Sequence, residues 1–370
     1  MNPVRLAPNS RVLVVVLRRL GDVLLTTPLI RSVKEAYPQV SIDALVFAGT
    51  EGILSGNPDL RDVIAIPQRP RFGETLSLIV RLFRRYDLAL SVQTGDRPTA
   101  LAVVAGRQSA GLVEPDRPGS VLKRLVLSRS CVNDRRRHRI ANVLSLAELL
   151  GIPVHGEIVC PAGAARPQLA PAQPYAVVHA APMFVYKRWT GEGWRALAAA
   201  LRERGFAIAV TGAAGDRGYL DDVWRNADVL RLDAKLRWPE LSALIVNARV
   251  YIGPDTAITH LAAATGTPTV AIYGPTDPRL WGPRPLGGLD QPWDAAGTIQ
   301  QRRNVWLVQN PLPCMPCQLE GCERRLDSHS QCLDELAVER VLSAIGEALK
   351  HDHREWITVL ERNQARATTS

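Results

Sequence analysis

Residues 251–278, YIGPDTAITHLAAATGTPTVAIYGPTDP, determine the expected fold. The apolar run at their start is broken by glycine and proline, and Asp255 and Thr256 are residue types that begin helices. A helix of small residues and a second apolar run, 269–273, follow. This order of strand, turn, helix and strand predicts a parallel sheet covered by helices, with its loops gathered at the carboxyl edge.

The turn at Asp255 and Thr256 has the chemistry of a phosphate site. A helix that starts at the end of a strand presents backbone N–H groups and the positive end of its dipole. His260 lies four residues after Thr256, so we expect it on the same helix face. A second loop, 274–278, leaves the same edge of the sheet. The pattern predicts a site for a phosphorylated ligand, with an ordinary α/β turn capped by Asp255 as the alternative.

The composition is that of a globular protein with an anionic partner. The chain has 370 residues, of which 46% are hydrophobic, and this length accommodates two domains. Its net charge of +9 favours nucleic acid, anionic lipid or a phosphorylated glycolipid, with a solvated basic face as the alternative. Basic and aromatic residues do not alternate, so nucleic-acid binding is not expected.

The apolar runs are strands rather than membrane segments. None approaches the roughly 20 residues of a membrane span, and the N-terminal run is too short for a signal peptide. We therefore expect a cytoplasmic protein.

Strands and helices alternate in two series, separated by the Pro- and Ala-rich stretch 161–174. The first series opens with the buried strand 11–17, RVLVVVL. We therefore predict two doubly wound, Rossmann-like domains that face each other across a cleft. The expected bounds are 1–165 for the first domain, 166–348 for the second and 349–370 for a terminal tail.

Two charged groups follow the first strand. Gly21 permits close backbone approach, and Asp22 is a candidate general base that takes a proton from a sugar hydroxyl, or alternatively a helix cap. Arg18 and Arg19 are candidate contacts for acceptor phosphates, or alternatively solvate the loop.

Two further loops in the second half hold candidate donor contacts. Lys187 and Arg188 would neutralise a leaving diphosphate, or alternatively form a solvated pair. Asp216 ends the glycine-rich loop 211–216 and would bind ribose hydroxyls, or alternatively cap the next helix.

Four cysteines are clustered late in the chain, and the first two have CxxC spacing. Such thiolates chelate a metal, so a structural Zn or Fe knuckle is predicted. Reduced thiols and facultative disulfides are the alternatives. The four residues are Cys314, Cys317, Cys322 and Cys332.

Several of these stretches together resemble the bacterial heptosyltransferases of glycosyltransferase family 9. The stretches that carry the resemblance are RRLGDVLLTTPLIRSVKEAYP (18–38), HAAPMFVYKRWTGEGW (179–194), GPDTAITHLAAATGTPTVAIYGPTDP (253–278) and CMPCQLEGC (314–322). Residues 47–60 and 275–283 look most like the lipopolysaccharide heptosyltransferase III type.

The resemblance implies a GT-B fold and an inverting transferase that needs no catalytic metal. The donor would be ADP-L-glycero-D-manno-heptose. The acceptor would be the lipopolysaccharide core on lipid A, at the cytoplasmic face of the inner membrane. The enzyme would then be peripheral to an anionic membrane surface. Arg18, Arg19 and the basic run 135–139 would meet acceptor phosphates and this anionic lipid.

By motif position, Asp22 corresponds to the family's base and Lys187 to the cation at the donor phosphates. Asp216 matches the acidic residue near the ribose approximately. The donor-binding turn corresponds to Asp255, Thr256, Ala257 and His260. The family commonly has glycine where Ala257 stands, and alanine is small enough to allow close approach.

Three rival functions remain open. Some relatives that glycosylate proteins carry a cysteine metal knuckle, so a protein acceptor or another nucleotide sugar is one alternative. A non-catalytic nucleotide-sugar-binding protein is the second, although intact Asp22, Lys187 and Asp255 favour an enzyme. A basic nucleic-acid binder is the third, which the charge permits but no recognition motif supports. The sequence makes no prediction of the oligomeric state.

Overall fold

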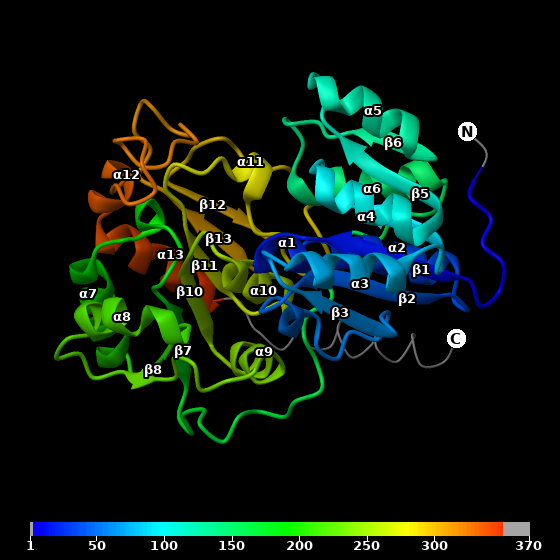
Figure 1. Cartoon of the computed structure of the whole chain (residues 1–370). Helices are drawn as coiled ribbons and strands as arrows, with labels where there is room; N and C mark the ends of the chain where they lie inside the picture. The colour runs from blue at the N-terminus through cyan, green and yellow to red at the C-terminus, as the bar shows by residue number, and fades with distance from the viewer. Residues whose placement is uncertain (1–2, 351–370) are drawn as a thin grey trace. The chain divides into compact units, whose positions relative to one another are not determined.

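The apolar runs of the sequence form the strands of two separate sheets in the computed structural model (Figure 1). The structure describes residues 3–350. The chain forms two compact units that divide between Pro161 and Ala162, within the Pro- and Ala-rich stretch. The predicted tail, 349–370, lies outside the described residues apart from Leu349 and Lys350.

The first unit has six parallel strands in the order β3-β2-β1-β4-β5-β6. They are β1 (Arg11–Val16), β2 (Ser41–Phe47), β3 (Asp62–Ile66), β4 (Tyr86–Ser91), β5 (Gly106–Val113) and β6 (Arg129–Val132). The helices are α1 (Leu20–Leu24), α2 (Thr27–Ala36), α3 (Phe72–Leu82), α4 (Asp96–Ala105), α5 (Pro118–Val126) and α6 (Arg139–Leu150), with the 3-10 turn η1 (Glu51–Leu54).

The direction of the connections decides which helices cover which face of this sheet. From β1 the chain steps outward to β2 and β3, and then steps the opposite way through β4, β5 and β6. Right-handed crossovers therefore place α3, α4 and α5 on one face and α2 on the other. On that other face, α2 packs against α6.

The second unit has seven strands in the order β12-β13-β11-β10-β7-β8-β9, and only the β12–β13 pair is antiparallel. They are β7 (Tyr175–His179), β8 (Ala207–Thr211), β9 (Leu230–Arg231), β10 (Val250–Pro254), β11 (Thr269–Ile272), β12 (Ile299–Arg302) and β13 (Val305–Val308). The helices are α7 (Gly191–Glu203), α8 (Arg217–Val223), α9 (Trp238–Val246), α10 (Ala257–Ala264), α11 (Pro278–Trp281), α12 (Gln331–Asp334) and α13 (Val338–Lys350), with the 3-10 turns η2 (Val185–Lys187) and η3 (Ala214–Asp216).

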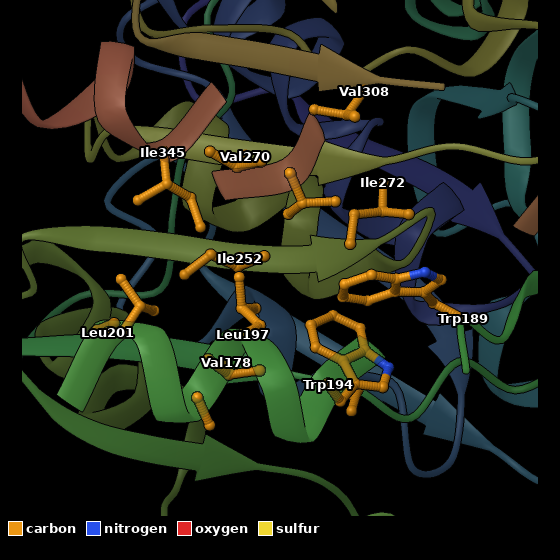
Figure 2. Close-up of a cluster of buried hydrophobic side chains, with 14 of the residues drawn as sticks. Val178, Trp189, Trp194, Leu197, Leu201, Ile252, Val270, Ile272, Val308 and Ile345 are labelled. Atoms are coloured by element: carbon orange, nitrogen blue, oxygen red, sulfur yellow. The ribbon is translucent and has the colours of Figure 1, made fainter. Parts of the chain in front are cut away.

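A tryptophan pair anchors the core of the second unit (Figure 2). The rings of Trp189 and Trp194 meet edge to face, with 5.0 Å between their centroids. Leu197 and Leu201 extend the same face of α7 over the sheet (Figure 2). Because Trp189 closely follows η2, this packing fixes the loop at the carboxyl end of β7.

Candidate active site

Asp22 is a buried carboxylate at the carboxyl end of β1. It is the third residue of α1, and its residue surface is 8% exposed. The N-cap of α1 is Arg19, so the alternative role of Asp22 as that cap is wrong. Instead, Oδ1 of Asp22 accepts a hydrogen bond from Nε of Arg139 at 3.1 Å. A carboxylate oriented by a cation is suited to accept a proton from a nearby hydroxyl.

Arg139 reaches this position from the first turn of α6. Its Nη2 donates to the backbone carbonyl of Val92, which follows β4, at 3.1 Å. Its side chain is 12% exposed. Burial lowers the pKa of Arg139, and the neighbouring Asp22 carboxylate opposes this. The expectation that Arg139 belongs to the exposed basic surface at 135–139 is therefore wrong. Arg135 of that run is exposed and pairs with Glu114 at 2.8 Å.

The other predicted residues of the first unit surround Asp22. Arg18 and Arg19 are exposed, and Gly21 is half-buried. The largest effects on the pKa of Arg139 are burial, which lowers it, and Asp22, which raises it. The positive charge of Arg18 is close enough to lower this pKa further. Two exposed cations thus precede the buried carboxylate by three or four residues. Their contact with an acceptor stays a prediction.

In the second unit, three loops meet at Asp255, because β10 lies between β7 and β11 in the sheet. Lys187, from the loop after β7, forms an ion pair with Asp255. Burial opposes the ionisation of Asp255, but Lys187, His260 and Thr276 together hold its pKa below the usual value. Thr276 belongs to the loop after β11. The carboxylate is therefore charged, and it links the loop after β7, which holds Lys187, to the loop after β11, which holds Thr276.

The start of α10 is the accessible part of this arrangement. Thr256 is the N-cap, and its hydroxyl accepts from the backbone N–H of Thr259 at 3.4 Å. Within residues 250–275, all of which the structure describes, only Thr256 and Ala257 are not buried. His260 is 4% exposed and contributes through the charge balance of Asp255. A phosphate would meet this unit first at the helix start.

The loop that carries Lys187 is held from behind by the C-terminal part of the unit. Nε1 of Trp189 donates to the carbonyl of Leu336 at 2.9 Å. The hydroxyl of Ser330 donates to the carbonyl of Tyr186 at 2.7 Å. Lys187 therefore lies in a segment fixed on both sides, which suits a residue that must hold a charge at a defined place.

Asp216 and its neighbours form a second polar group at the end of β8. Oδ2 of Asp216 accepts from the N–H of Ala213 at 2.8 Å, a bond that caps the 3-10 turn η3. Asp216 is also the N-cap residue of the next helix, α8, but its side chain makes no capping bond there. Burial lowers the pKa of His179 to about 4, although nearby Asp216 raises it. The Arg188 guanidinium lies 3.9 Å from the ring centroid of Tyr219, so Arg188 stacks rather than forming a solvated pair with Lys187.

The four late cysteines lie near one another as free thiols. Burial, and then the charges of the other three, raise the pKa of Cys332 to about 12. In the described part of the chain, no group of three or more His, Cys, Asp or Glu side chains is arranged to hold a metal. The metal knuckle at Cys314, Cys317, Cys322 and Cys332 thus stays a prediction from spacing.

Comparison with known proteins agrees with this architecture. The sequence model of "Glycosyltransferase family 9 (heptosyltransferase)" matches residues 75–323. Lipopolysaccharide heptosyltransferase 3 of Escherichia coli K12 is 28% identical over 90% of this chain and 96% of its own length. Lipopolysaccharide heptosyltransferase 1 of Pseudomonas aeruginosa is also 28% identical, over 90% of this chain and 93% of its own length.

The solved structure of E. coli ADP-heptose lipopolysaccharide heptosyltransferase II superposes with a TM-score of 0.71. The match covers 92% of this chain and 98% of that chain at 19% identity. The two α/β units, each built on a mainly parallel sheet, are thus those of a GT-B glycosyltransferase. The chain belongs to glycosyltransferase family 9 and is a heptosyltransferase.

Proposed function

We propose that this heptosyltransferase moves heptose from ADP-L-glycero-D-manno-heptose to the inner core of lipopolysaccharide. The names of its relatives, which act on lipopolysaccharide, support this acceptor. The donor assignment is supported chiefly by one observation in the second unit. A fixed lysine, Lys187, is held by Asp255 beside the accessible start of α10.

In the proposed reaction, Asp22 takes the proton of an acceptor hydroxyl while the hydroxyl oxygen attacks the anomeric carbon of the donor. The new C–O bond forms as the bond from that carbon to the diphosphate oxygen breaks, which inverts the configuration. ADP leaves with the bonding electrons. Lys187 and the backbone N–H groups of Thr256 and Ala257 stabilise its charge.

The remaining site residues take supporting roles in this proposal. Asp216 binds ribose hydroxyls, and His260 supports the charge of Asp255. Arg18, Arg19 and the backbone at Gly21 meet acceptor phosphates beside Asp22. The enzyme would act at the inner face of the inner membrane.

The experiment incubates the purified chain with ADP-heptose and, in separate reactions, core glycolipid that lacks the heptose and candidate proteins. Mass spectrometry of the products shows which acceptor gains a heptose. Transfer to the glycolipid supports the proposal. Transfer only to a protein would replace the acceptor, and donor binding without turnover to any acceptor would indicate a non-catalytic binding protein. Core oligosaccharide from cells with and without the chain provides an independent measurement.

A further inference from the structure

Helix α3 of the first unit exposes an unusual amount of apolar surface. Eight of the fourteen large hydrophobic side chains that are exposed in the described residues lie on or next to α3 and α5. On the α3 side these are Phe72, Leu76, Val80 and Phe83, at spacings of three and four that put them along one helix face. The face opposite is the core face, where Leu78 and Leu82 are buried.

Helix α5 repeats this feature with even less attachment to the core. Val121, Leu122, Leu125 and Val126 are exposed, with Leu125 at 77%. Ser120 is the one residue of this fully described helix that is buried. The apolar side of α5 therefore faces outward, and nothing in the described residues covers it.

Both apolar helices are tied to the same point of the unit. Arg97 in the first turn of α4 donates to the carbonyls of Pro67 and Gln68, just before α3. Lys123 of α5 forms an ion pair with Asp96, the first residue of α4, at 2.7 Å. The three helices share one face of the sheet, as the connections require (Figure 1). The exposed apolar residues thus lie along the helices on either side of α4, and both helices start at the carboxyl edge of the sheet.

Cations surround this surface. Exposed arginines near α3 are Arg69, Arg71, Arg81, Arg84 and Arg85. Glu74 is the one acidic residue of α3, and its carboxylate accepts from the backbone N–H of Arg71 at 2.7 Å. On the α5 side, Arg117 and Arg124 are exposed. Apolar side chains bordered by cations match the order of a bilayer surface, in which anionic headgroups lie above acyl chains.

We propose that α3 and α5 together form the membrane-docking surface of the enzyme, and that its partner is an anionic lipid bilayer. The assignment rests on the proposed function, since a glycolipid acceptor is held in a membrane. No helix in the described residues is long and apolar enough to cross a bilayer, so the apolar side chains enter only its interfacial layer. The Asp22 turn lies at the same carboxyl edge of the sheet that the starts of α3 and α5 border.

The test measures flotation of the full chain with vesicles that contain no acceptor. One set is pure phosphatidylcholine, and the other contains phosphatidylglycerol. Binding is expected on the anionic set, and it should weaken as salt rises, because the screening length falls from about 8 Å at 0.15 M to 3 Å at 1 M. In a double variant, Leu76→Ser with Leu125→Ser, vesicle binding should fall by at least about tenfold.

Matched controls separate docking from general effects. Val154→Ser changes an exposed apolar residue of the same unit that lies outside both helices, and it should bind vesicles normally. Turnover of a deacylated, soluble acceptor should be unchanged in the double variant. If the unmodified chain does not turn over this acceptor, the proposed function is wrong. Vesicle binding is measured separately and still tests the docking surface.

Hydrogen exchange of the unmodified chain keeps the test independent of mutant folding. Anionic vesicles should protect residues 72–83 and 118–126 and leave the second unit unchanged. Equal binding by the double variant, or protection elsewhere only, would overturn the proposal. Self-association of the chain through these helices without lipid, seen by sedimentation and abolished in the double variant, would also overturn it in favour of a protein interface.

Discussion

Nε of Arg139 lies 3.1 Å from Oδ1 of Asp22, although 117 positions separate the two residues in the chain. The same guanidinium also bonds the carbonyl of Val92. One arginine therefore joins the loops after β1 and β4 to the start of α6, and it orients the carboxylate that we propose as the base.

Replacing Arg139 should reduce kcat while leaving the KM for the donor nearly unchanged. We expect Arg139→Gln to lose about tenfold in kcat, because the carboxylate loses its orienting partner. Arg139→Lys should recover part of the loss, since it restores the charge without the second contact. Steady-state kinetics give the measurement. In an Asp22→Asn background, Arg139→Gln should have no further effect on turnover, and an additive effect would contradict the positioning role.

Asp22→Asn tests the base directly. The amide is nearly isosteric but accepts no proton, so kcat should fall by about 10²- to 10⁴-fold. Donor affinity, measured by calorimetry, should change little because the donor contacts that we propose lie in the second unit. Near-normal turnover would eliminate Asp22 as the base.

Removing either partner of the Lys187–Asp255 ion pair should lower the free energy of unfolding. Lys187→Ala leaves a carboxylate that is 8% exposed without its cation, so unfolding free energy should fall by about 3 kcal/mol. Urea unfolding measures this. Turnover should fall by about 10²- to 10³-fold as the departing diphosphate loses its charge partner. Arg195→Ala, in the same unit, is the control, and equal loss of turnover there would point to a general effect.

Burial of His179 predicts a pH-dependent stability. Its folded pKa is about 4, below the model-peptide value of 6.5. The unfolded chain therefore binds the proton first as the pH falls, so stability is present at neutral pH and is lost between pH 6.5 and 4, by about 3 kcal/mol. Denaturant unfolding across this range should show a shallower pH dependence in His179→Gln. Identical profiles would show that another group is responsible.

The cysteine cluster predicts a metal content that can be counted. If the knuckle forms, the purified chain should carry about one Zn or Fe, and a variant with Cys314→Ser and Cys317→Ser should carry none. Element analysis of the two proteins decides this. Turnover should survive a chelator, since no proposed step uses the metal. Equal metal content in both proteins would remove the prediction.

The sequence predicts the central strands well because burial on both faces leaves a clear signal. The strand predicted at 11–17 is β1 (Arg11–Val16), and the apolar run predicted as a strand at 269–273 is β11 (Thr269–Ile272). β5 gives no such signal, since its sequence GRQSAGLV is partly polar. α5 buries only one serine, so its apolar residues do not indicate a helix packed on a core.

The candidate site shows the same limit. Asp22, Lys187 and Asp255 stand out because each follows the end of a strand. Arg139 does not, because its partner is distant in the chain and its neighbours form a basic run that suggests an exposed face. Only the register of β1 and β4 brings its two acceptors together.

The bonds from Trp189 to Leu336 and from Ser330 to Tyr186 bracket Cys332 as well as Lys187. These two hydrogen bonds therefore join the segment that carries Cys332 to the segment that carries Lys187, so the two segments move together. Oxidation, or another rearrangement that displaces the short helix α12 at Cys332, would therefore shift the backbone that carries Lys187, although the ammonium itself pairs with Asp255.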